Sequence, residues 1–253
     1  MTEIMMFDAV VLAGQRNDGA FQAVSDAPNE ALIEIGGRTM LDYVLSALQG
    51  AGRVDRIVVV GTPEVEAALP AGVEYQAAGD EIIDNVLHGL GKLASDRLVM
   101  VVTSDIPLLT PVAVDDLAAR CAAQPADIYY PAIPRAAAER GYPGVERTYV
   151  KLREGTFTGG NIFVVNPRVA PDLAARLKAF VDARKSPAKM AGLLGPGFAI
   201  KLMLGALSTA ELEAKVAGMF GVRGAVVFTE YAEIGVDVDK LTDLELAKRV
   251  LAQ

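Results

Sequence analysis

The sequence of 253 residues contains no tryptophan, a single cysteine and a single histidine. The lone Cys121 excludes a disulfide within the chain, which is typical of proteins in a reducing compartment, so we expect a cytoplasmic protein. The sequence shows no Ser–His–Asp or Cys–His set, and His88 falls within an expected helix, where a surface or packing role is more common than a catalytic one. Chemistry in this protein is therefore expected to proceed without a side-chain nucleophile.

Basic residues are also scarce relative to acidic ones, with 24 Lys and Arg against 32 Asp and Glu and a net charge of −8 at pH 7. This balance argues against nonspecific binding to nucleic acid. A polyphosphate ligand would need local neutralisation by backbone amides, a few cations or a metal ion. No uninterrupted apolar run reaches the ~20 residues of a membrane-spanning helix. The N-terminus also lacks the basic and apolar segments of a signal peptide, so we expect neither a leader nor a membrane span.

Apolar strand patterns alternate with amphipathic helix patterns through the first half of the chain. This alternation predicts an α/β fold with a doubly wound, mostly parallel sheet. The expected strands are 7–12, 56–60, 73–76, 98–102 and 127–130. The expected helices are 39–50 with Thr39 as N-cap, a short one from Pro63, one capped by Asp80 to about residue 93, and 111–122.

Beyond residue 131 the pattern changes. We expect a polar loop at 134–144, strands at 147–153, 159–167 and 222–228, and a closing helix at 242–251 capped by Thr242. The helical region at about 171–221 is interpreted as an insertion in one domain of residues 1–253. Its apolar stretch Phe198–Leu207 is expected to pack in the core or to form a homodimer contact.

The most informative stretch is Val10–Gly19, in which a buried strand breaks into Ala13-Gly14 and is followed by Arg16. A loop of small residues at the carboxyl end of a strand lets backbone N–H groups approach a ligand, because no Cβ intervenes. Together with Arg16 this arrangement suits phosphate. Many first strands of α/β proteins end in Ala-Gly simply to turn, so both interpretations stay open.

Carboxylates form the second pattern. Asp105 comes directly after the strand 98–102, and ligands of open α/β sheets bind beyond that edge. Asp237 and Asp239 alternate in an extended segment, so they project to the same side. Paired carboxylates suit Mg²⁺, which proteins often hold with one or two carboxylates plus substrate phosphates. Asp243 is expected to act only as a partner of the last helix dipole.

The order and spacing of these stretches resemble those of the MobA-like nucleotidyltransferases, within a wider group of cytidylyl-, guanylyl- and sugar-phosphate nucleotidyltransferases of glycosyltransferase-A type. The matching segments are Leu12–Arg16, Glu30–Leu41, Ser104–Pro107, Gly160–Asn161 and Val238–Leu244. The resemblance implies Mg²⁺-dependent transfer of a nucleoside monophosphate from an NTP to a phosphorylated small-molecule acceptor, such as a sugar phosphate or a cofactor precursor. Pyrophosphate is the other product.

The resemblance also implies the site residues. Arg16 and Asp105 are the implied catalytic residues, and Mg²⁺ is held by Asp105 with Asp239, with Asp237 as the competing second ligand. The implied nucleotide-binding residues are Leu12, Ala13, Gly14, Arg16, Gly79, Asp80 and Asn85, although Asp80 as an N-cap and Asn85 as a surface residue fit as well. The implied acceptor-binding residues are Arg147, Lys151, Thr158, Gly160 and Asn161, with Arg147, Lys151 and Arg153 on one basic strand face.

Two features depart from the family pattern. The glycine loop is compressed at Gln15-Arg16, and Glu30 stands where a lysine contacts phosphate. A glutamate there repels a triphosphate by roughly a few kcal/mol if close and dry, and far less if solvated. The candidate substitute cations are Arg16, Arg38, Lys185 and Lys189.

Two alternative functions follow. Glu30 favours a nucleotide-binding protein without turnover. The Asp237-Val-Asp239 segment is formally an Asp-x-Asp motif, which favours a glycosyltransferase that uses a nucleotide sugar, although its position near the C-terminus counts against this.

Overall fold

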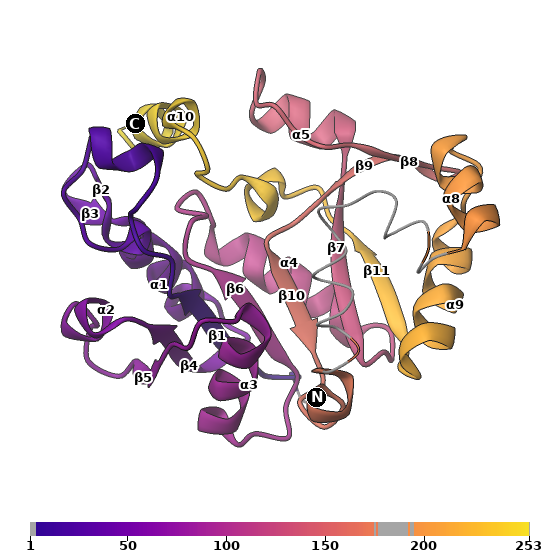
Figure 1. Ribbon diagram of the computed structural model, residues 1–253, viewed down its shortest axis with the longest axis horizontal. Coiled ribbons are helices and arrows are strands. Elements are labelled where there is room, and N and C mark those ends of the chain that lie inside the picture. The colour runs from indigo at the N-terminus through magenta and orange to yellow at the C-terminus, as the bar shows by residue number, and fades with distance from the viewer. Residues whose placement is uncertain (1–3, 175, 177–191, 193–194, 253) are drawn as a thin grey trace.

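The computed structural model describes residues 4–174, 176, 192 and 195–252. Its centre is a nine-stranded sheet in the order β5-β4-β1-β6-β10-β7-β9-β8, with β11 paired to β7 (Figure 1). The strands of this sheet are β1 (Phe7–Ala13), β4 (Val54–Gly61), β5 (Glu74–Ala77), β6 (Val99–Thr103), β7 (Ile128–Pro134), β8 (Val150–Leu152), β9 (Gly155–Gly159), β10 (Ile162–Val165) and β11 (Gly224–Phe228). A separate two-stranded sheet pairs β2 (Glu34–Ile35) with β3 (Arg38–Thr39).

Strand direction changes once the sheet passes β6. Strand β1 pairs in parallel with β4 and β6, and β4 pairs in parallel with β5. Strand β10 is antiparallel to β6 and β7, β9 is antiparallel to β7 and β8, and β11 is parallel to β7. Within this sheet β9 and β10 therefore run against the other strands. The predicted α/β fold with a mostly parallel sheet is confirmed.

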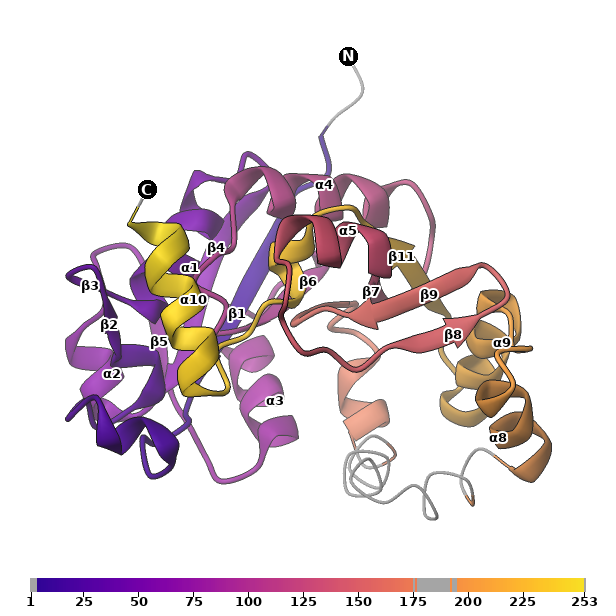
Figure 2. The same cartoon turned by 90° about the horizontal axis from the view of Figure 1, so that it is seen from above.

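Helices cover both faces of the sheet (Figure 2). Helices α1 and α4 lie on one face, and α3, α8 and α9 lie on the other. The helices are α1 (Met40–Gly50), α2 (Pro63–Ala67), α3 (Ile82–Leu93), α4 (Pro111–Ala122), α5 (Arg135–Gly141), α8 (Pro196–Met203), α9 (Thr209–Phe220) and α10 (Leu241–Leu251). Alternation within β1 explains the two layers, because Ala9 and Val11 join the core under α1 and α4, whereas Val10 packs with the core under α3.

Helix starts follow local capping. The predicted N-cap Thr39 is confirmed, with its hydroxyl accepting from Asp42 N at 3.0 Å and a capping box completed by Asp42. The expected Thr242 cap is wrong, because α10 begins at Leu241 and the Asp243 carboxylate accepts from Lys240 N at 2.9 Å. The expected Asp80 cap is also wrong, since the N-cap of α3 is Glu81.

Three further local expectations need correction. The expected loop 134–144 contains α5, because its alanines are strong helix formers, two of them are buried, and Arg135 pairs with Glu139 one turn later. The expected strand 159–167 breaks at Gly160, whose N–H donates to Pro131 O, so β9 ends and β10 begins separately. The expected strand 147–153 is shorter than predicted, because only Val150–Leu152 form a strand, β8.

The expected helical insertion at 171–221 falls partly outside the described residues. Its described part holds α8 and α9, which pack on β8 and β11. Phe198, Leu202 and Leu207 of the apolar stretch join a cluster with Leu152 and Phe157. Ile200, Met203 and Leu204 of the same stretch are exposed. Within the described part of the chain, no helix is long and apolar enough to cross a membrane.

Candidate functional site

Three carboxylates converge just beyond the carboxyl end of β6. Asp105 follows that strand, and Asp237 and Asp239 lie in the segment after a 3₁₀ helix, η3 (Ala232–Gly235). One carboxylate oxygen from each residue lies within 4.8 Å of those of the other two. Val238 is buried between the two later aspartates, so both project to the same side, as expected from their spacing. The structure thus brings together all three residues predicted to bind the metal.

Backbone hydrogen bonds connect this late segment to the sheet. Val238 N donates to Asp105 O at 2.9 Å, and Asn161 N donates to Ile234 O at 2.8 Å. Thr103 N in turn donates to Asn161 O at 3.2 Å. Asn161 of the predicted acceptor site is therefore hydrogen-bonded both to β6, which precedes Asp105, and to η3, which precedes Asp237 and Asp239.

Like charges crowd in this cluster. Burial raises the pKa of Asp105 to about 6, and the charges of Asp237 and Asp239 add to the shift. The Thr103 hydroxyl donates a hydrogen bond to the Asp105 carboxylate, and this bond lowers the pKa of Asp105 and so opposes the shift. Burial and the charge of Asp237 also raise the pKa of Asp239. A cation among the three groups would relieve this repulsion.

The donor set fits a divalent cation. All three groups offer hard carboxylate oxygens, which Mg²⁺ prefers. Ligand oxygens around Mg²⁺ lie ~2.1 Å from the ion, hence about 3 to 4 Å from one another, and the three carboxylate oxygens here lie within 4.8 Å of one another. Asp105, Asp237 and Asp239 could hold such an ion.

Glu30 lies within the electrostatic influence of the same cluster. It begins a second 3₁₀ helix, η2 (Glu30–Leu32), and its N–H donates to Gln15 O at 3.1 Å. Burial raises the pKa of Glu30, followed by the charges of Asp105, Asp239 and Asp18. The position where the family pattern has a lysine therefore adds a further negative charge to the site.

The predicted nucleotide residues lie on the other side of β1 from Asp105. A Cβ on Gly14 would lie 3.2 Å from the Ala78 Cβ and 3.7 Å from the Asn85 Nδ2, so this glycine permits close approach of the β1 loop to α3. The Asn85 side chain accepts from Gly79 N at 2.6 Å and donates to Gly79 O at 3.2 Å. Gly14, Gly79 and Asn85 are thus brought together, with Asp80 exposed beside them.

Two buried asparagines shape the loop between β1 and η2 and were missed from the sequence. Asn29 donates to Ala13 O at 3.0 Å and accepts from Ala31 N at 2.9 Å. Asn17 donates to Ser25 O and Ala27 O, at 3.0 and 2.9 Å. The Asn29 position just before a short helical turn is a typical N-cap signal that could have identified it.

Arg16 is exposed on this loop. Its backbone forms an isolated antiparallel bridge with Asn29. Leu12 O accepts from Ser104 N at 3.2 Å. The end of β1 is therefore bonded to the segment that follows β6.

The expected basic strand face is wrong for Arg147. This residue lies before β8, half-buried, and its Nη1 donates to Gly235 O. Its Nε and Nη2 are buried and find no hydrogen-bond partner among the described residues. Arg147 is therefore not part of an open face of β8, and its contact with an acceptor phosphate stays a prediction.

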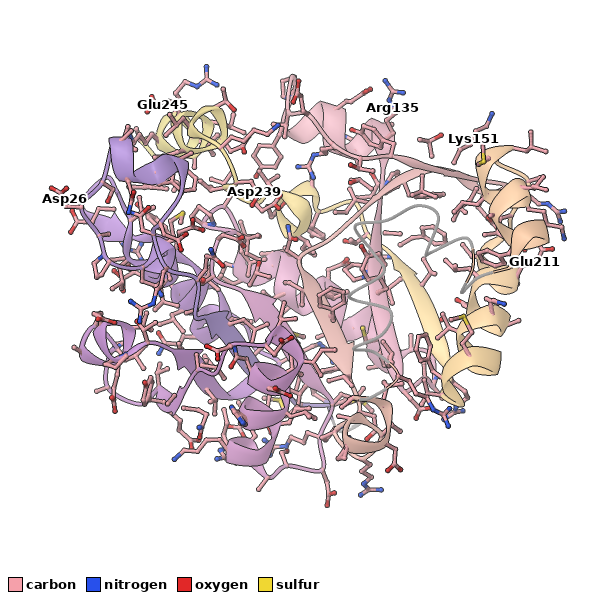
Figure 3. All side chains as sticks on the ribbon, viewed as in Figure 1. Asp26, Arg135, Lys151, Glu211, Asp239 and Glu245 are labelled. Atoms are coloured by element: carbon pink, nitrogen blue, oxygen red, sulfur yellow. The ribbon has the colours of Figure 1, made fainter. Side chains whose placement is uncertain are left out.

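Lys151 lies apart from the cluster. Among the described strands β8 pairs only with β9, so Lys151 lies at the edge of the sheet. Figure 3 shows Lys151 beside α8 and Asp239 near the centre of the molecule. Thr158 is buried in β9, and Gly160 is buried against Pro131 and Ile234.

Of the cations proposed to replace a lysine at position 30, Arg38 is used elsewhere. Its guanidinium lies 4.3 Å from the centre of the Tyr43 ring and donates to Asp42 O and Ser46 Oγ. Lys185 and Lys189 fall outside the described residues.

Comparison with known proteins identifies the following similarities. Residues 9–185 match the profile of the MobA-like NTP transferase domain. A solved structure of a hypothetical transferase from Thermus thermophilus is 36% identical, with a TM-score of 0.83 over 95% of this chain and 100% of that one.

Similarity to named enzymes is more distant. A 3-deoxy-manno-octulosonate cytidylyltransferase from Actinobacillus pleuropneumoniae is 31% identical over 103 residues, which is 38% of this chain and 41% of that protein. The match therefore spans about two fifths of the length of this curated relative. A CMP:2-keto-3-deoxy-manno-octonic acid synthetase solved with CTP shares the fold, with a TM-score of 0.61 and 16% identity over 98% of this chain and 99% of that one.

Proposed function

Because this chain belongs to the MobA-like NTP transferase family, we propose that it is a Mg²⁺-dependent nucleotidyltransferase. It transfers a nucleoside monophosphate from an NTP to a phosphorylated small molecule, either a sugar phosphate or a cofactor precursor. An oxygen of the acceptor phosphate forms a bond to the α-phosphorus while the bond to the departing pyrophosphate breaks. The observation that carries this proposal is the convergence of Asp105, Asp237 and Asp239 beside the β1 loop.

The residues divide the work by position. Asp105, Asp237 and Asp239 hold Mg²⁺, which when bound neutralises charge on the reacting phosphates. The loop of Leu12, Ala13 and Gly14 orients the triphosphate, and Arg16 provides a positive charge for the pyrophosphate.

Gly79, Asp80 and Asn85 form the side of the site that binds the base, where Asn85 keeps the Gly79 backbone in place. Asn161 and Gly160, with Thr158 behind them, lie on the acceptor side. Positioning is the main contribution, since transfer between phosphates needs no protein nucleophile.

The test is pyrophosphate release from each NTP with a panel of phosphorylated acceptors and Mg²⁺. Asp105→Asn should reduce the rate at least 100-fold, because one of three metal ligands loses its charge. Asp96→Asn, an exposed partner of Arg168, should leave the rate unchanged. An Asp105→Asn protein with the wild-type rate would refute the metal assignment. Release of UDP from a nucleotide sugar in the same panel would favour the glycosyltransferase instead.

A second candidate is a nucleotide-binding protein without turnover, and Glu30 favours it. A negative charge beside the metal cluster weakens triphosphate binding. This candidate predicts that NTP and Mg²⁺ raise the melting temperature, because the ligand binds the folded state, with no pyrophosphate from any acceptor. Turnover with one acceptor would exclude it.

A homodimer through α8 completes the proposal, supported by the exposed Ile200, Met203 and Leu204. Sedimentation equilibrium of the wild type and of Met203→Glu tests this contact. A monomeric wild type would refute it.

A further inference from the structure

Arg147 has an unusual environment for a cation. One of its nitrogens, Nη1, donates to Gly235 O, while Nε and Nη2 are buried and without a hydrogen-bond partner among the described residues. A buried guanidinium normally makes several hydrogen bonds, because desolvation of its charge is costly. Among the described residues, the bond to Gly235 O is therefore the hydrogen bond that this guanidinium makes.

The bond reaches the segment that carries the metal ligands. Gly235 ends η3 and precedes Asp237 by two residues. A Cβ on Gly235 would lie 2.7 Å from Gly159 O, 2.7 Å from the Ile133 Cδ1 and 3.1 Å from the Arg147 Nη1. Gly159 O, the Ile133 side chain and Arg147 Nη1 thus surround the same side of Gly235, where no larger residue fits.

Two other hydrogen bonds flank the same point. Ile234 O accepts from Asn161 N on one side, and Val238 N donates to Asp105 O on the other. Without Arg147, the stretch between these two bonds would lose the side-chain contact at its centre. Two aspartates that repel each other and Asp105 would then be free to separate.

The positive charge of Arg147 would by itself weaken cation binding, whereas its hydrogen bond to Gly235 would strengthen that binding by holding the aspartates in place. Asp237 lies close enough to oppose the lowering of the Arg147 pKa that burial causes. A positive charge behind Asp237 weakens the attraction of the site for a divalent cation. Geometry and charge therefore predict opposite effects of removing Arg147, so an experiment can separate them.

We infer that Arg147 is a positioning residue for the metal site, which holds the Gly235 carbonyl so that Asp237 and Asp239 face Asp105 before a cation binds. This inference rests on the metal site of the proposed function. It replaces the expected role of Arg147 in acceptor binding.

The test measures Mn²⁺ binding without nucleotide, by isothermal titration calorimetry or electron paramagnetic resonance. Arg147→Gln should weaken Mn²⁺ binding at least 10-fold, whereas loss of the positive charge alone would strengthen it. Arg147→Lys should recover part of the affinity, because an ammonium can still donate to one carbonyl but lacks the planar fork. Arg140→Gln is the matched control, since Arg140 pairs with Glu230 on the surface and should bind Mn²⁺ as the wild type does.

Hydrogen exchange provides a readout that does not depend on metal. The Val238 amide, bonded to Asp105 O, should exchange at least 10-fold faster in metal-free Arg147→Gln than in the wild type or Arg140→Gln. Arg147→Lys takes its place in both measurements if Arg147→Gln does not fold.

Two outcomes overturn the inference. These are Mn²⁺ binding by Arg147→Gln that equals or exceeds that of the wild type, and an unchanged exchange rate at Val238. The Asp105→Asn protein keeps the inference separate from the proposed function. Loss of Mn²⁺ binding in Asp105→Asn but not in Arg147→Gln refutes only the positioning role, and retention in Asp105→Asn refutes the metal site itself.

Discussion

Glu30 carries a negative charge at the position where the family pattern has a lysine. Its carboxylate lies in the field of Asp105, Asp239 and Asp18, and it starts η2 directly after the buried Asn29. A triphosphate beside the β1 loop would meet this charge. Affinity for NTP therefore depends more on the divalent cation than it would with a lysine at position 30.

Glu30→Lys should bind NTP about 10-fold more tightly in Mg²⁺, or about 1.4 kcal/mol. The substitution replaces a repulsive charge by an attractive one, and partial solvent exposure keeps the gain well below the dry limit. Glu30→Gln should give a smaller gain. Titration of each protein with NTP by calorimetry measures the effect. Glu34→Lys, on exposed β2, is the control, and an equal gain in that protein would show that Glu30 does not face the phosphates.

The convergence of Asp105, Asp237 and Asp239 could be predicted from the sequence, and the contact of Arg147 with Gly235 could not. Asp105 directly follows an apolar strand, and Asp237 and Asp239 alternate, so local pattern sufficed. Arg147 is defined by contact with Gly235, far along the chain, and its alternation with Lys151 and Arg153 pointed to a strand that starts later. Glu30 was noticed only through the family pattern.

Helix α10 is positioned by its first turn. Asp243 accepts from Lys240 N at 2.9 Å and from Asp239 N at 3.3 Å, so it caps the helix and also holds the backbone of Asp239, a predicted metal ligand. Negative charge in this turn also favours the helix dipole.

Asp243→Ala should lower the free energy of unfolding by about 1 kcal/mol, because two backbone N–H groups lose their acceptor. Urea unfolding measures the change. Glu245→Ala, which removes an exposed pair with Lys248, should cost about 0.5 kcal/mol or less. Equal costs for the two substitutions would show that the cap contributes nothing beyond a surface pair.

Elements were predicted best where one pattern dominated. The parallel half of the sheet follows from apolar runs between helices, because both faces of these strands are buried. Helix α5 was missed since arginine, glutamate and proline around its alanines suggested a loop, whereas burial of Ala137 and Ala138 stabilises the helix. The break between β9 and β10 depends on Pro131 and Ile234, which only the fold places beside Gly160.

Stability of the whole molecule is coupled to its acidic site. The pKa of Asp105 is about 6 in the folded protein against 3.8 as its ordinary value, so the native state binds more protons between about pH 4 and 6. The free energy of unfolding of the metal-free protein therefore falls as pH rises through this window and stays lower above it.

Asp105→Asn should thus stabilise the metal-free protein at pH 8, by up to about 3 kcal/mol, and much less at pH 4. Thermal unfolding in EDTA at both pH values measures this. Asp96→Asn should show neither effect. A destabilised Asp105→Asn protein at pH 8 would mean that the ionised Asp105 is favourable in the fold.

The hydrogen bond from Val238 to Asp105 has a consequence for biosynthesis. Strands β1, β4, β5 and β6 all precede Asp105 in the chain, so this half of the sheet is synthesised while Asp105 still lacks Asp237 and Asp239 beside it. The three carboxylates come together only after residues 234–239 have left the ribosome and Val238 has bonded to Asp105.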